Sequence, residues 1–97
     1  LAIVVCGNMQ KAQGGCGEFW VQDVSAATEN ILLAATAQGL GGVWCGTWPR
    51  MENVKKIQEI LNLPSNVVPY SMLAIGYPAE NPQPKDKYTE DNVIRFE

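Results

Sequence analysis

The sequence contains no histidine, and this absence excludes several kinds of site at once. A zinc site needs Cys or His ligands at short spacings, and Cys6, Cys16 and Cys45 form no CxxC pair. No side chain has the setting of a general acid or an activated nucleophile, since Cys45 has no basic partner in the pattern. The sequence therefore predicts no metal site and no catalytic side chain. We interpret the cysteines as small apolar fillers or free thiols.

Positive charge is also scarce. Seven Lys and Arg stand against ten Asp and Glu, the net charge is −3, and no basic run exists, so we expect no nucleic-acid partner. The longest apolar stretches fall short of the ~20 residues that a membrane helix needs, so we expect no membrane span. The chain opens directly in an apparent strand with no initiator methionine, which we interpret as truncation. Unpaired cysteines fit a reducing cytoplasm, where we place the protein.

The longest uninterrupted pattern is the stretch 21–40, which has no proline and a single glycine, Gly39, near its end. It predicts a helix of about five turns that is apolar on more than one face. A chain of 97 residues has little with which to cover such a helix, so we expect it to pack against a second copy or a missing half. Gly39 is suited to the left-handed residue that stops a helix.

Gly41 and Gly42 follow before a short strand predicted at 43–46. Bare backbone of this kind allows a flat ligand to approach closely. It is also typical of a tight turn from helix to strand, which is the commoner use of clustered glycines. Both interpretations stay open at this stage.

The other elements follow from shorter patterns. Apolar runs at 2–7 and 67–77 predict two strands in the middle of a sheet. Between them Thr47 is placed to cap a second, amphipathic helix that has Pro49 in its first turn and ends at Pro64. The glycine-rich loop 8–17, with Gly14, Gly15 and Gly17, could hold an anion at the start of the long helix, although a plain surface loop is commoner.

The last part of the chain changes character at Pro78, where three prolines in close succession block regular structure. A short apolar segment, VIRF at 93–96, then predicts a strand suited to pair with a sheet edge in its own subunit or in a partner. Residues 81–97 are therefore expected to form an extended arm.

These motifs together resemble the carboxyl-terminal half of the FMN-dependent nitroreductase family. The likeness runs from Trp20 to Glu80 through a helix followed by GLGGVW, the helix end LNLP and the strand end AIGYPAE, and it resumes at Pro84 with PKDKY. It implies an α+β, three-layer fold with a mixed or antiparallel sheet flanked by helices, of which residues 1–97 are the carboxyl-terminal part of one domain. It also implies transfer of hydride from NAD(P)H through FMN to a small acceptor such as a nitroaromatic or a quinone. The family's homodimer with an exchanged carboxyl-terminal arm is implied as well.

The resemblance also places a cofactor site. It implies that the backbone amides of Cys45, Gly46 and Thr47 lie next to flavin N5 and O4, where they would stabilise the negative charge of the reduced flavin. It assigns the FMN phosphate to Lys85 and Lys87, which without the resemblance we would interpret as solvated surface charge.

Part of the family's pattern is missing. Nothing in the chain matches the family's amino-terminal segment of arginine and serine, so the site is incomplete here. A flavoenzyme of the same fold with another outcome, such as reductive dehalogenation or flavin fragmentation, and a non-catalytic assembly module remain as alternatives.

Overall fold

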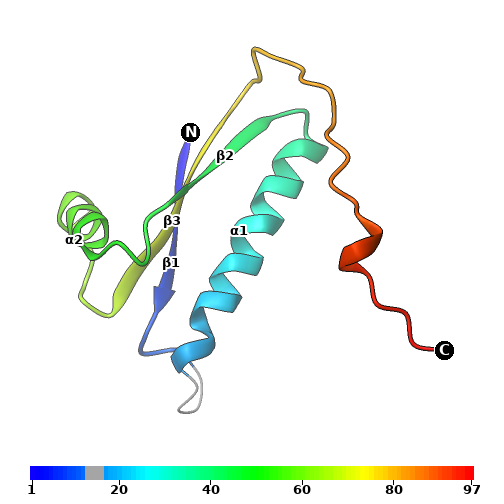
Figure 1. Ribbon diagram of the computed structural model, residues 1–97. Helices are drawn as coiled ribbons and strands as arrows, with labels where there is room; N and C mark the ends of the chain where they lie inside the picture. The colour runs from blue at the N-terminus through cyan, green and yellow to red at the C-terminus, as the bar shows by residue number, and fades with distance from the viewer. Residues whose placement is uncertain (13–16) are drawn as a thin grey trace.

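Three antiparallel strands lie between two helices in the computed structural model, which describes residues 1–12 and 17–97 (Figure 1). The strands are β1 (Ala2–Asn8), β2 (Gly41–Gly46) and β3 (Val67–Gly76), in the spatial order β1-β3-β2. Helix α1 (Trp20–Ala37), preceded by the short helix η1 (Gly17–Phe19), packs against all three strands, and α2 (Met51–Ile60) packs against β3. This arrangement confirms the predicted α+β fold. Gly14, Gly15 and Cys16 lie outside the described residues.

Strand β3 is central, as predicted, because both of its edges are paired. Its side chains alternate, so Leu73 and Ile75 face the core beneath α1 while Met72 lies with Ile57 of α2 on the opposite face. The same expectation is wrong for β1, which is an edge strand of the described sheet. A run of β-branched residues indicates a strand in apolar surroundings, but it does not indicate how many strands pair with it.

Helix α1 ends at Ala37, three residues before the predicted limit, because Gly39 adopts a left-handed φ of +73°. Its inner face contributes Val24, Thr28 and Ala35 to the interior. On its outer face Leu33 remains 59% exposed. The described part of the chain thus leaves an apolar side of α1 uncovered, and no helix within it has the length and apolarity required to cross a membrane.

The core is small and lies between α1 and the sheet. Leu73, Ile75 and Ala35 form its buried centre. Partly buried apolar residues surround them: Ile3, Val5, Ile31, Leu32 and Leu40. Gly42 completes this packing, since a Cβ at that position would come within 2.8 Å of Leu32 Cδ2 and Ile75 Cδ1. Neither interpretation of the glycine cluster accounts for Gly42, which is required instead by the close packing of α1 on β2.

The connection from β2 to α2 differs from the prediction. Arg50 occupies the N-cap position of α2 without a side-chain cap, and Pro49 lies before the helix. Thr47 therefore does not cap the helix, which is a correction to the sequence-based prediction. Its side chain is buried and its amide is bound to Tyr70 of β3, so Thr47 ends the sheet and does not start the helix.

The carboxyl-terminal arm runs along the far side of α1 from the sheet (Figure 1). It contains one short helix, η2 (Glu90–Asn92), which contacts no other helix or strand of the described chain. Residues 93–96 form no strand within this single chain, because a strand needs a partner edge and none of the described strands lies beside them. Their pairing with a sheet edge of a partner stays a prediction. The radius of gyration of 16.6 Å exceeds the roughly 12–13 Å of a compact chain of this length, as a detached arm requires.

Candidate functional site

The predicted flavin-edge residues lie at the end of β2, where they line a hollow of about 280 Å³. Cys45, Gly46 and Thr47 form one wall of this hollow. The remaining walls come from the first turns of α2 and from β3: Asn53, Lys56, Ile57 and Met72. Ile57 and Met72 also line a larger apolar hollow of about 460 Å³ between α2 and the sheet. The site is therefore a mostly apolar depression with one strand end at its rim.

The three backbone amides of this segment do not all face the same edge of β2. The amide of Thr47 donates to the Tyr70 carbonyl oxygen at 3.0 Å, toward β3. Because N–H groups alternate between the two edges of a strand, the Cys45 amide faces β3 as well, while the Gly46 amide faces the unpaired edge of β2. The structure thus narrows the prediction from three outward amides to one, that of Gly46.

Gly46 is also the glycine of this segment with free space beside it. A Cβ built at Gly46 meets no atom of the described chain within 4 Å, whereas one at Gly41 lies 3.4 Å from Pro78 Cβ. Gly42 is closed off by the core, as described above. A flat ligand could therefore approach the backbone at Gly46 and not at the two earlier glycines.

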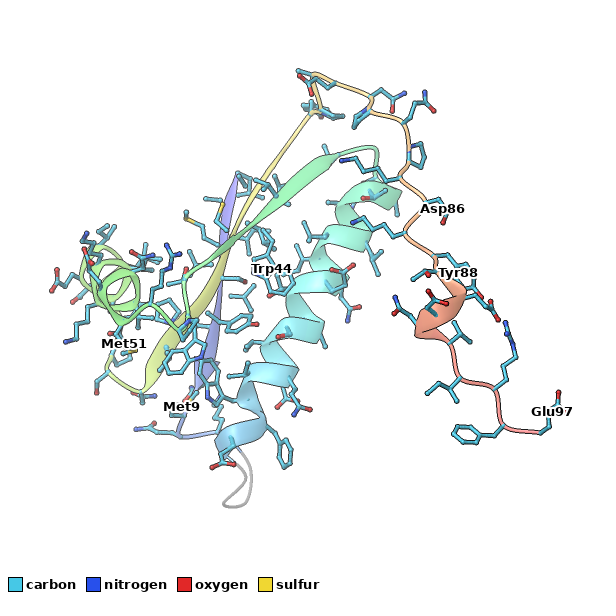
Figure 2. All side chains as sticks on the ribbon, in the orientation of Figure 1. Met9, Trp44, Met51, Asp86, Tyr88 and Glu97 are labelled. Carbon is cyan, nitrogen blue, oxygen red and sulfur yellow. The ribbon has the colours of Figure 1, made fainter. Side chains whose placement is uncertain are left out.

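Lys85 and Lys87 lie on the arm and do not meet this hollow within the chain. Both are exposed, and Asp86 between them is labelled in Figure 2 across α1 from Met51, the residue that begins α2. One chain therefore holds the flavin-edge backbone and the two lysines on opposite sides of α1. A single ligand could use both only if the arm of another copy supplies the lysines or the arm lies elsewhere when the ligand is bound.

The cysteines occupy different environments. Cys6 is half-buried, and burial raises the pKa of its thiol, which suits the predicted role of an apolar filler. Cys45 is exposed at the rim of the hollow, so of the two predicted roles it has that of a free thiol. Within residues 1–12 and 17–97, no three metal-ligating side chains gather.

Comparison with known proteins identifies the family. The model of the nitroreductase family matches residues 9–77, which is well over half of the chain. This chain belongs to the nitroreductase family.

Individual relatives and solved structures agree with this family assignment. It is 43% identical over 95 residues to a protein of Methanothermobacter thermautotrophicus named as a candidate NADH dehydrogenase/NAD(P)H nitroreductase, covering 96% of the chain and 48% of that relative. A crystal structure of the same description from Bacteroides thetaiotaomicron is 38% identical and superposes with a TM-score of 0.87. The match covers 97% of this chain and 53% of that protein. An FMN-dependent nitroreductase from Clostridium difficile is 29% identical with a TM-score of 0.74. That match covers 98% of this chain and 56% of the other protein. The chain thus spans about half the length of the curated relatives that it matches.

Sequence reasoning missed the residue that organises this site. Tyr70 accepts the amides of Thr47 and Trp48 through its carbonyl oxygen, and its ring packs between Trp20 and Trp44. Tyr70 lies at a β-bulge, which is visible in the register of β1 on β3. A tyrosine within an apolar strand gives no sequence signal of such a bulge. The only hint in the sequence is that a tyrosine hydroxyl in an otherwise apolar run needs a polar partner.

Proposed function

We propose that the protein is an FMN-dependent oxidoreductase that passes hydride from NAD(P)H to a small acceptor such as a nitroaromatic or a quinone. The observation that carries this proposal is the outward Gly46 amide beside open space, in a chain that belongs to the nitroreductase family. The solved relative from Clostridium difficile is described as FMN-dependent, and the relative from Methanothermobacter thermautotrophicus carries NAD(P)H in its name. Both descriptions favour the same cofactors here.

The residues at the strand end fit part of a flavin. FMN, when bound, supplies the hydride-accepting N5 atom, and a backbone amide beside N5 and O4 stabilises the charge that develops on reduction. Gly46 has the donor and the space for this contact, and the apolar wall of Ile57 and Met72 suits a flat ring. The amides of Cys45 and Thr47 face β3, so these two residues would not donate to the flavin. They would instead line the hollow beside Gly46.

We further propose that the phosphate is held by Lys85 and Lys87 from an exchanged arm, in a cytoplasmic homodimer. Ammonium groups on exposed side chains form charge-assisted hydrogen bonds with phosphate oxygens. The separation of these lysines from the hollow within one chain supports a second copy as their source (Figure 2). The uncovered outer face of α1 offers apolar surface for such a dimer.

The full-length protein tests the proposal by its colour. It should purify with the visible absorption bands of flavin or acquire them with added FMN, NAD(P)H should bleach them without oxygen, and a nitroaromatic or quinone should restore them. A protein that stays colourless after reconstitution would favour an assembly module. Bleaching without restoration by any such acceptor would favour a flavoenzyme with another outcome.

The Cys45→Ser variant is expected to keep its activity within about tenfold of the wild type. The thiol is exposed, and the basic side chain that lines the same hollow, Lys56, is ion-paired with Glu52, so we expect no activation of the Cys45 sulfur as a nucleophile. Steady-state reduction of a nitroaromatic by NAD(P)H at matched flavin content measures this. A loss of about a hundredfold with flavin still bound would show that the sulfur takes part in the reaction.

A further inference from the structure

Tyr70 lies at an irregularity in β3. Val5 of β1 is opposite Ser71, and Cys6 is opposite Pro69, so Tyr70 is the extra residue of a β-bulge. A bulge changes the direction of the next side chains. Here it turns two consecutive hydroxyls toward α1, where Tyr70 Oη lies 2.6 Å from Ser25 Oγ and Ser71 Oγ lies 2.9 Å from Thr28 Oγ1.

The direction of the hydrogen bond between Tyr70 and Ser25 follows from its surroundings. Ser25 Oγ donates its single hydrogen to the Val21 carbonyl oxygen at 2.6 Å, and a carbonyl can only accept. Ser25 must therefore accept from Tyr70, which is the donor. The phenol is thus anchored through the serine to the backbone of the first turns of α1.

The other end of Tyr70 holds the segment that follows β2. Its carbonyl oxygen accepts the amides of Thr47 and Trp48, each at 3.0 Å. Its ring contacts Trp20 of α1 and Trp44 of β2 edge to face, with centroid distances of 5.9 and 6.0 Å. The side of the sheet on which these rings meet is the side of α1, where Figure 2 shows Trp44.

We propose that Tyr70 is a positioning residue that aims the Gly46 amide and thereby sets the reduction potential of the bound FMN. The Tyr70–Ser25 hydrogen bond fixes the residue whose carbonyl holds Thr47 and Trp48, and these bonds fix the direction of the one amide left facing outward. An amide aimed at the N5 and O4 edge stabilises the reduced flavin more than the oxidised flavin. If the Gly46 amide loses this orientation, reduction of the bound FMN becomes less favourable. This inference rests on the proposed function, because it needs flavin at Gly46.

Two variants and one matched control test the proposal in the full-length protein. Tyr70→Phe and Ser25→Ala each remove the hydrogen bond between Tyr70 and Ser25. Ser71→Ala removes the neighbouring side-chain bond to Thr28, which joins the same strand to the same helix. Ser71 lies opposite Gly46 in the sheet, but its hydroxyl takes no part in the bonds that hold the amides of Thr47 and Trp48. The first two should shift the equilibrium toward oxidised FMN by about tenfold, or about 30 mV for a two-electron couple, and Ser71→Ala should leave it unchanged. Spectroelectrochemical titration at full FMN occupancy measures the shift.

Amide hydrogen exchange gives a second readout that does not depend on flavin. Exchange at Thr47 and Trp48 should accelerate about tenfold in Ser25→Ala and remain at the wild-type rate in Ser71→Ala. If Tyr70→Phe does not fold, Ser25→Ala alone decides. Variants that bind FMN with wild-type potentials would overturn the inference and leave the proposed function standing. A wild-type protein that takes up no FMN would overturn both.

Discussion

Deletion of residues 84–97 is expected to cost the protein both its dimeric state and its FMN. Val93, Ile94 and Phe96 are exposed in the single chain, the last two by 79% and 94%. Burial of each such side chain in a second copy would contribute about 1.5–3 kcal/mol, so their removal should weaken dimerisation by at least about a hundredfold. Loss of the two lysines should weaken FMN by about a hundredfold as well, since each charge-assisted bond contributes about 1.5–3 kcal/mol.

Sedimentation and the absorbance of retained flavin measure these two effects together, and two milder variants separate them. Lys85→Ala with Lys87→Ala should remain dimeric and lose FMN. The double variant Ile94→Ser with Phe96→Ser should lose dimer affinity while it keeps both lysines. The helices and strands of the truncated protein should be unchanged by circular dichroism, because η2 contacts none of them in the described chain. A truncated protein that stays dimeric and yellow would exclude both roles of the arm.

Gly46→Val is expected to weaken FMN binding by at least about tenfold while leaving the apoprotein folded. A side chain at Gly46 stands beside its own outward amide, so it would block the approach of a flat ring to that donor. A Cβ at Gly46 would meet no atom beyond its chain neighbours within 4 Å, and valine suits a strand, so stability should change by less than about 0.5 kcal/mol. Fluorescence titration with FMN and urea unfolding of the apoprotein measure the two quantities.

Gly42→Ala is the matched control for this variant, because it adds a side chain four residues earlier in the same strand. Its Cβ would press on the side-chain tips of Leu32 and Ile75, so we expect a loss of about 1 kcal/mol in the free energy of unfolding and little change in FMN affinity. Wild-type FMN binding by Gly46→Val would show that the flavin edge does not lie at the end of β2.

The sequence predicted the elements whose signals are local. The long α1 follows from the absence of proline between 21 and 40, its end follows from Gly39, and the central position of β3 follows from apolar residues on both of its faces. The errors concern features that depend on neighbours. The edge position of β1 in the described sheet depends on which segments lie beside it, and no single sequence pattern encodes that. Residues 93–96 form no strand within the single chain, and their pairing with a partner stays a prediction.

The site could be predicted only in outline. The resemblance located the segment 45–47, but which amide faces outward depends on the phase of β2 against β3, and Thr47 proved to be bound to Tyr70. Similarly, Gly42 and Gly46 are indistinguishable as letters, yet one is enclosed by Leu32 and Ile75 and the other is open. Tyr70 itself could not be singled out, because a bulge arises from the pairing of two strands far apart in the chain.

The free edge of β2 can serve only one occupant at a time. The same N–H of Gly46 that is available to a cofactor would be consumed if another strand joined the sheet along β2. Strand addition along β2 and cofactor binding at Gly46 therefore compete for this edge, and within the described sheet the outer edge of β1 is the other place where a strand could join. If 93–96 of a second copy adds a strand to a sheet whose β2 edge holds a cofactor, β1 is the edge of the described sheet that would receive it.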